Sequence, residues 1–152
     1  MAARIEGARF LDLCAGSGAV GIEALSRGAA HVTFVDQSRK MCGLIESNLN
    51  SLEIPQDNYH VVLAEALDYL RRQVEKSELA FDALFFDPPY AMDYDGLLKF
   101  IGDHTSQILD VDAIVIVEHH KKKLLATQFN ALTRYRELKQ GDSVLSFYKL
   151  EE

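Results

Sequence analysis

A dense apolar run at residues 81–86 stops abruptly at the tetrapeptide Asp87-Pro88-Pro89-Tyr90. Two consecutive prolines fix φ at both positions and remove two N–H donors, so neither a sheet ladder nor a helix can continue there. The carboxylate of Asp87, the carbonyl oxygen of Pro88 and the ring of Tyr90 are therefore free to face a ligand. The tetrapeptide predicts a site for a planar ligand with an amino group; an ordinary proline-rich turn is the alternative.

The chemistry that such a site suits is methylation of an exocyclic amino group on a nucleic-acid base. This amine is a poor nucleophile because its lone pair is delocalised into the ring. Acceptance of its two N–H bonds by Asp87 and the Pro88 carbonyl would free the lone pair for in-line attack on a methyl group. Stacking of the base on Tyr90, beside Pro89, would contribute about 1–3 kcal/mol. We predict Asp87, Pro88 and Tyr90 as catalytic residues, and Pro89 and Tyr90 as substrate-binding residues.

A second constellation, Asp12-Leu13-Cys14-Ala15-Gly16-Ser17-Gly18, places two glycines where an apolar run turns into a helical pattern. Because glycine has no side chain, backbone N–H groups can approach a ligand closely and φ can be positive. Gly16, Gly18 and Gly21 also satisfy the GxGxxG pattern of dinucleotide sites, in which an acid such as Asp36 follows about 20 residues later. The glycines alone leave a dinucleotide site and a simple tight turn open.

The carboxylate of Asp12 favours S-adenosylmethionine over a dinucleotide. An acid just before the glycines can pair with the ammonium of a methionine moiety, whereas it would face a pyrophosphate unfavourably. Asp36 can accept hydrogen bonds from both ribose hydroxyls, and Glu65 can accept one from the adenine amine. The predicted cofactor-binding residues are Asp12, Ala15, Gly16, Gly18, Asp36, Glu65 and Ala66.

The periodicity of apolar residues predicts the elements that position these groups. Strands are expected at residues 10–14, 31–35, 59–64, 81–86 and 113–117, with helical patterns at 20–25, 41–52, 67–74 and 97–101 between them. Strands at 133–139 and 143–149 flank Gln140-Gly141-Asp142, which is typical of a hairpin turn. We predict an α/β, doubly wound, Rossmann-like methyltransferase fold: a mostly parallel seven-stranded sheet with an antiparallel C-terminal hairpin. Ligands bind beyond the carboxyl ends of such strands, where Asp12, Asp36, Glu65 and Asp87 fall.

Length and composition indicate a single domain over residues 1–152. The chain has 152 residues, 48% of them hydrophobic, which suffices for a substantial core. No apolar run approaches the roughly 20 residues that cross a bilayer, so no membrane partner is expected. Two cysteines are too few for a disulfide framework and favour free thiols in a reducing cytoplasm. No metal-ligand spacing is present, and Glu118-His119-His120 is better explained as the end of a strand.

The charge is unevenly distributed along the chain. Sixteen Lys and Arg against 23 Asp and Glu give a net charge of −7, the wrong sign for gripping phosphates. Residues 119–140, however, carry six basic residues and one acid, Glu137, so this segment is +5 and the remainder −12. Such asymmetry is compatible with a basic lip on an acidic body. We predict Lys121, Lys122 and Lys123 as substrate-binding residues, with a merely solvated face as the alternative.

Three runs of sequence resemble one family. They are Asp12-Leu13-Cys14-Ala15-Gly16-Ser17-Gly18-Ala19, Glu23-Ala24-Leu25-Ser26-Arg27-Gly28-Ala29 and Asp87-Pro88-Pro89-Tyr90. They are similar to the RsmD-type family of bacterial guanine-N2 methyltransferases of small-subunit ribosomal RNA. The similarity extends over nearly the whole chain, including Val117-Glu118-His119 and Gly141-Asp142-Ser143.

The resemblance implies S-adenosylmethionine as cofactor and ribosomal RNA, within the small subunit, as partner. We expect a monomer. It implies that the Asp12, Gly16, Gly18, Asp36 and Glu65 positions contact the cofactor and that the tetrapeptide holds the guanine. Methylation of adenine in DNA or of another substrate, and a non-catalytic nucleotide-binding module, remain alternatives. Two departures from the family stand out: Cys14 replaces a usual aromatic residue, and the family's basic N-terminal segment is expected to be missing.

Overall fold

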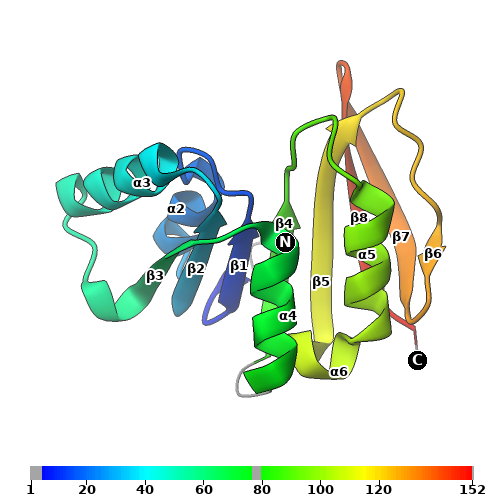
Figure 1. Cartoon of the computed structure of the whole chain (residues 1–152), viewed down its shortest axis with the longest axis horizontal. Helices are drawn as coiled ribbons and strands as arrows, with labels where there is room; N and C mark the ends of the chain where they lie inside the picture. Colours follow the sequence, from blue (N-terminus) through cyan, green and yellow to red (C-terminus); the bar gives the residue numbers. More distant parts are fainter. Residues whose placement is uncertain (1–4, 77–79, 152) are drawn as a thin grey trace.

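The computed structural model describes residues 5–76 and 80–151 and contains one sheet of strand order β3-β2-β1-β4-β5-β8-β7-β6. Strands β3, β2, β1, β4 and β5 pair in parallel, and β8 pairs antiparallel to β5. The parallel strands are β1 (Arg9–Leu13), β2 (His31–Asp36), β3 (Tyr59–Leu63), β4 (Phe81–Phe86) and β5 (Leu109–His120). The expected doubly wound architecture is confirmed, and Figure 1 displays the twisted sheet.

Helices connect the parallel strands. They are α2 (Ala19–Ser26), α3 (Arg39–Ser51), α4 (Ala66–Lys76), α5 (Tyr94–Asp103) and the short α6 (Thr105–Ile108); a 3₁₀ turn covers Gln56–Asn58. Two of these helices begin at side-chain caps, because the Ser38 hydroxyl accepts from the Met41 amide and the Asp93 carboxylate accepts from the Gly96 amide. Among the described residues, no helix is both long and apolar enough to cross a membrane.

The C-terminal part departs from the prediction in strand number. The expected hairpin is formed by β7 (Leu132–Gln140) and β8 (Ser143–Leu150), with Gly141 at φ 61° in the turn. The sheet nevertheless has eight strands instead of seven, because β6 (Gln128–Phe129) pairs with the start of β7. A two-residue strand is too short to produce an alternating pattern, so periodicity cannot reveal it.

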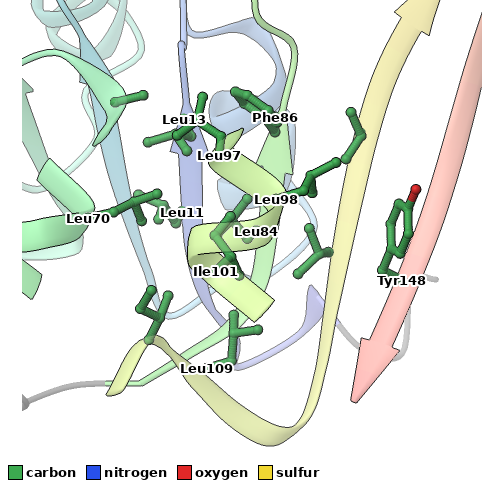
Figure 2. Packing of buried hydrophobic residues seen from close by; sticks show 14 of the residues in the cluster. Leu11, Leu13, Leu70, Leu84, Phe86, Leu97, Leu98, Ile101, Leu109 and Tyr148 are labelled. Carbon is green, nitrogen blue, oxygen red and sulfur yellow. The ribbon is translucent and has the colours of Figure 1, made fainter. Parts of the chain in front are cut away.

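A hydrophobic core lies on each face of the sheet. On one face α5 and α4 cover the strands, and Figure 2 shows Leu98 and Ile101 of α5 packed towards Leu84 of β4. On the other face, Ile45 and Leu49 of α3 belong to the core with residues of the adjoining strands. Residues 113–117 of β5 are buried without interruption, as expected of a central strand covered on both sides.

The strand order reverses between β1 and β4, which lie side by side although β2 and β3 separate them in the sequence. At such a switch point the loops that leave neighbouring strands diverge and open a crevice at the carboxyl edge. The glycine-rich loop follows β1, and residues 87–93, here called loop 87–93, follow β4. The fold therefore brings the two predicted constellations together at one edge.

Candidate active site

The glycine-rich loop after β1 has the left-handed backbone that its glycines favour. Gly16 has φ 58° and Gly18 has φ 83°, and Gly18 precedes the first residue of α2. Cys14 also has a positive φ, 64°, which is uncommon for a residue with a side chain. A Cβ atom built at Gly16 would meet no atom within 4 Å, so the space above this residue is open to a ligand. At Gly21, by contrast, a Cβ would overlap the Phe34 ring.

Asp12, near the end of β1, binds the first turn of the helix that follows this loop. Its side chain is only 2% exposed, and its carboxylate accepts a 3.0 Å hydrogen bond from the Gly21 amide in the first turn of α2. Because Gly18 offers no side-chain cap, Asp12 takes the role of an N-cap acceptor from the preceding strand. Burial raises the pKa of Asp12 to about 7, an effect that the carboxylates of Asp87 and Asp36 reinforce.

Asp36 links β2 to the same loop. It is the last residue of β2, and its two carboxylate oxygens accept hydrogen bonds from the Gly16 amide at 2.9 Å and the Ser38 amide at 2.8 Å. Two carboxylate oxygens offer about four lone-pair sites, so acceptor capacity remains for a ligand. Asp36 is half-buried, which leaves that capacity accessible.

A small cavity of about 70 Å³ lies at the carboxyl ends of β1, β2, β3 and β4. Its walls are Cys14, Val35, Asp36, Gln37, Ala64, Ala66, Pro89 and Met92. The structure thus brings the predicted Asp36, Ala66 and Pro89 together and adds Gln37 and Met92, which no sequence motif indicates. Glu65 stands beside this wall as an exposed residue between β3 and α4.

The electrostatic character of this edge is strongly acidic. Burial raises the pKa of the Cys14 thiol to about 12, with further contributions from the carboxylates of Asp36, Asp12, Asp87 and Glu65. All four acids predicted from the sequence therefore act on one point at the end of β1. Such a concentration of carboxylates attracts a cation and repels a phosphate.

The tetrapeptide after β4 presents its groups in different environments. Pro88 is buried, whereas Asp87, Pro89 and Tyr90 are exposed; the Tyr90 ring is 61% exposed. Partial desolvation raises the pKa of Asp87 to about 6, and the nearby Glu118 carboxylate at the end of β5 raises it further. The sequence predicts Glu118 only as part of a strand end, and β5 does end at His120 as expected.

Tyr94 and Lys123 form hydrogen bonds to loop 87–93. The sequence alone does not predict these contacts. The buried Tyr94 donates a hydrogen bond of 2.8 Å from its hydroxyl to the Pro88 carbonyl oxygen. The Lys123 ammonium donates to the carbonyl oxygens of Tyr90 at 2.9 Å and Met92 at 3.1 Å. Figure 1 shows loop 87–93 and the chain leaving β5 at the same end of the sheet.

The three consecutive lysines have three different surroundings. Lys121 forms an ion pair of 3.0 Å with Asp142 in the β7–β8 turn, and both side chains are largely exposed. Lys122 is exposed, and its ammonium has no hydrogen bond or ion pair with the described residues. Lys123 is half-buried against loop 87–93. Lys121 and Lys123 nevertheless line one pocket together with Arg134 and Lys139, whereas Lys122 is not among the residues that line it.

The strand order, the glycine-rich loop after β1 and the Asp-Pro-Pro-Tyr tetrapeptide after β4 define a Rossmann-like fold of the methyltransferase type. A family model described as conserved hypothetical protein 95 matches residues 1–149. The chain belongs to this family, which is the RsmD-type family that its motifs indicate.

Named relatives and a solved structure agree with this assignment. The putative rRNA methyltransferase YlbH of Bacillus subtilis is 34% identical over 145 residues, which cover 95% of this chain and 77% of that protein. Ribosomal RNA small subunit methyltransferase D of Haemophilus influenzae is 31% identical over 121 residues, covering 79% and 61%. The putative methyltransferase yhhF from Escherichia coli has a TM-score of 0.83 at 29% identity, covering 97% of this chain and 78% of that one.

Proposed function

We propose that this chain transfers a methyl group from S-adenosylmethionine to the exocyclic amine of a guanine in small-subunit ribosomal RNA. The observation that carries the proposal is the meeting of an acidic glycine-rich loop with the Asp-Pro-Pro-Tyr tetrapeptide at one sheet edge. One constellation suits a cationic cofactor, and the other suits an amine to be methylated.

The cofactor side of the site fits S-adenosylmethionine better than a dinucleotide. The cofactor carries a sulfonium and an ammonium, and the four carboxylates near Cys14 would stabilise both charges. Asp12 would act through its charge, since its carboxylate is buried and bonded to the Gly21 amide. The remaining lone pairs of the Asp36 carboxylate would accept hydrogen bonds from the ribose hydroxyls. A cavity of about 70 Å³ holds only part of such a ligand, and the rest would lie over Gly16, where space is open.

The substrate side of the site fits a base amine. The Pro88 carbonyl keeps one lone pair after it accepts from Tyr94, and Asp87 stands exposed beside it. These two acceptors could take the two N–H bonds of the amine, and the exposed Tyr90 ring offers a stacking surface. Asp87 need not be a strong base, because the methylated ammonium is itself acidic.

The names of the relatives support ribosomal RNA as the substrate class, and the guanine N2 atom follows from the family resemblance. A different amino methyltransferase, acting on adenine in DNA, uses the same tetrapeptide chemistry and is the second candidate. We propose a monomeric enzyme in a single domain, without a membrane partner.

Transfer of tritium from labelled S-adenosylmethionine tests the proposal. Deproteinised ribosomal RNA, assembled small and large subunits, and DNA are offered separately, and the labelled nucleoside is then identified, with Asp87→Asn as the control. N2-methylguanosine in small-subunit RNA is the expected product. Labelled N6-methyladenine in DNA would favour the second candidate, whereas cofactor binding without transfer to any acceptor would indicate a binding module.

A further inference from the structure

Lys123 interacts with loop 87–93 through both its charge and its N–H donors. Its ammonium donates to the Tyr90 carbonyl oxygen at 2.9 Å and to the Met92 carbonyl oxygen at 3.1 Å. The same ammonium lies 4.1 Å from the centroid of the Tyr94 ring and 5.2 Å from that of the Tyr90 ring. Cation–π attraction operates within about 6 Å of a ring centroid, so both aromatic rings are in range. One side chain therefore touches three residues of the segment that follows β4.

Loop 87–93 has few donors of its own to fix its shape. Pro88 and Pro89 lack N–H groups, so neither can tie the loop to its surroundings. Within the loop the Met92 amide donates to the Pro89 carbonyl at 2.9 Å, and at its end the Tyr94 amide, the first of α5, donates to the Met92 carbonyl at 3.0 Å. An ammonium has three N–H donors and can therefore bind carbonyl oxygens of the loop. Such charge-assisted hydrogen bonds are stronger than those between neutral groups.

The loop that Lys123 holds is part of both halves of the site. Pro89 and Met92 form one wall of the cavity beside Cys14 and Asp36, and Pro88 and Tyr90 belong to the substrate side. A small displacement of this loop would therefore misplace the acceptor for the amine with respect to the cofactor. Misplacement by about 1 Å can reduce an enzyme's rate by roughly a hundredfold.

We propose that Lys123 is a positioning residue that fixes loop 87–93 between cofactor and substrate, and that its ammonium is bound to this loop and not to a phosphate of the RNA. This inference rests on the proposed function, because it assigns the lysine a part in the same site. Lys122 provides the contrast, since it carries the same charge one residue earlier and has no bond to the loop among the described residues. Substitutions of Lys123 and Lys122 should therefore affect different measured properties.

Hydrogen exchange in the full chain measures the first consequence without any need for activity. In Lys123→Met, which keeps an apolar stem over Tyr94 but loses the donors, the Met92 and Tyr94 amides should exchange roughly ten times faster or more. Lys122→Met should leave these two amides at the wild-type rate. Lys123→Arg, which can donate to two carbonyls, should restore most of the protection.

Single-turnover methylation at saturating cofactor and RNA measures the second consequence. Lys123→Met should lower the rate constant about ten- to a hundredfold, while RNA affinity and its salt dependence stay as in wild type. Lys122→Met should instead weaken RNA binding and flatten its salt dependence.

Unchanged exchange of both amides in Lys123→Met would overturn the proposal, as would a wild-type rate at saturation combined with weaker RNA binding. If the wild-type chain methylates no nucleic acid, the proposed function fails, but the exchange experiment still decides whether Lys123 holds the loop. If Lys123→Met does not fold, Lys123→Arg is compared with wild type. Wild-type protection of the loop amides in that variant, combined with a large loss of rate, would then contradict the proposal.

Discussion

The Tyr94 hydroxyl donates a 2.8 Å hydrogen bond to the Pro88 carbonyl oxygen, six residues earlier in the chain. The hydroxyl belongs to the first residue of α5, whereas the carbonyl belongs to the loop that precedes this helix. A carbonyl oxygen has two lone pairs, so this bond occupies one and leaves the other for a ligand. The packed Tyr94 ring, 5.8 Å from the Phe86 ring between centroids, thereby fixes the direction in which the Pro88 carbonyl can accept.

We expect Tyr94→Phe to reduce turnover roughly three- to tenfold, because the Pro88 carbonyl loses its fixed orientation. The free energy of unfolding should fall by about 0.5–1.5 kcal/mol, the net value of one hydrogen bond. Tyr148→Phe is a matched control: this buried hydroxyl donates to the Ala126 carbonyl at 2.7 Å, away from loop 87–93. It should cost similar stability and leave turnover unchanged. Equal turnover losses in both variants would mean that Tyr94 matters only for folding.

Asp87→Asn keeps the shape of the side chain but presents a neutral acceptor and a donor to the target amine. We expect single-turnover rates to fall by roughly 10²–10³, the range for loss of one preorganised hydrogen-bonding group. Affinity for S-adenosylhomocysteine should change little, because the role proposed for Asp87 is to accept from the substrate amine and this ligand lacks the sulfonium charge. Wild-type turnover in this variant would contradict the mechanism, and a variant that does not fold would assign Asp87 a structural role.

The pH dependence of turnover should report the same carboxylate. The pKa of Asp87 is raised to about 6, and its ionised form is the stronger acceptor for an N–H bond of the amine, so the rate should rise as pH increases through about 6. Glu118→Gln removes a neighbouring negative charge that contributes to the raised pKa, so the rising limb should move to lower pH. A limb that stays in place would mean that Glu118 does not act on Asp87.

Asp36→Ala should weaken binding of S-adenosylhomocysteine by about 1–3 kcal/mol, because the ribose hydroxyls lose a charged acceptor. The Gly16 amide also loses its 2.9 Å partner, so the loop itself should loosen. Asp36→Asn can still accept from that amide and should lose less. Titration calorimetry measures both affinities. Tighter binding of NAD than of S-adenosylhomocysteine by the wild-type chain would instead favour a dinucleotide site.

The buried Asp12 should make stability depend on pH. Its folded pKa is raised from 3.8 to about 7, so its stabilising contribution is complete below about pH 4 and is lost as pH rises through 7. Between pH 5 and pH 8 this loss amounts to about 2–3 kcal/mol. Asp12→Asn has no proton to release and can still accept from Gly21. Its stability relative to wild type, measured by urea unfolding, should therefore improve from pH 5 to pH 8; an unchanged difference would mean that Asp12 is not desolvated.

Lys121 and Lys122 are the two members of the lysine run without a bond to loop 87–93 among the described residues: Lys121 pairs with the exposed Asp142, and the Lys122 ammonium has no partner there. If both bind RNA, Lys121→Gln with Lys122→Gln should reduce the slope of log affinity against log salt by about 0.7–0.9 for each lysine–phosphate pair removed. Cofactor affinity should stay the same. A slope equal to that of the wild-type chain would identify these lysines as a solvated surface.

The positions of the candidate site residues that follow strand ends can be predicted from the sequence. Alternating and continuous runs of apolar residues locate each parallel strand to within a few residues. Parallel strands present their carboxyl ends at one edge of the sheet. Asp36 and Asp87 could therefore be placed near each other without a structure. The sequence predicts a first strand that ends at Cys14, whereas β1 ends at Leu13 because Cys14 adopts a left-handed backbone.

Long-range pairings were beyond the reach of sequence patterns. The bond from Lys123 to the Tyr90 carbonyl spans 33 positions, and no local pattern distinguishes Lys123 from Lys121 or Lys122. Charge alone grouped the three lysines together. The partner of Asp12 likewise depends on how the loop bends back to present the Gly21 amide. Such pairings are determined by tertiary packing and leave no periodic trace.

The bonding of Lys123 to loop 87–93 also limits how this protein can be recombined with its relatives. A chimaera that received the Asp87–Tyr90 tetrapeptide alone would depend on the recipient chain for the side chain at the Lys123 position, because Lys123 comes after β5. Crossover points between β4 and β5 would separate the two partners, whereas an exchange of residues 81–125 as one block would keep them together. Residues 81–125 should therefore be exchanged as one unit if this half of the site is to stay intact.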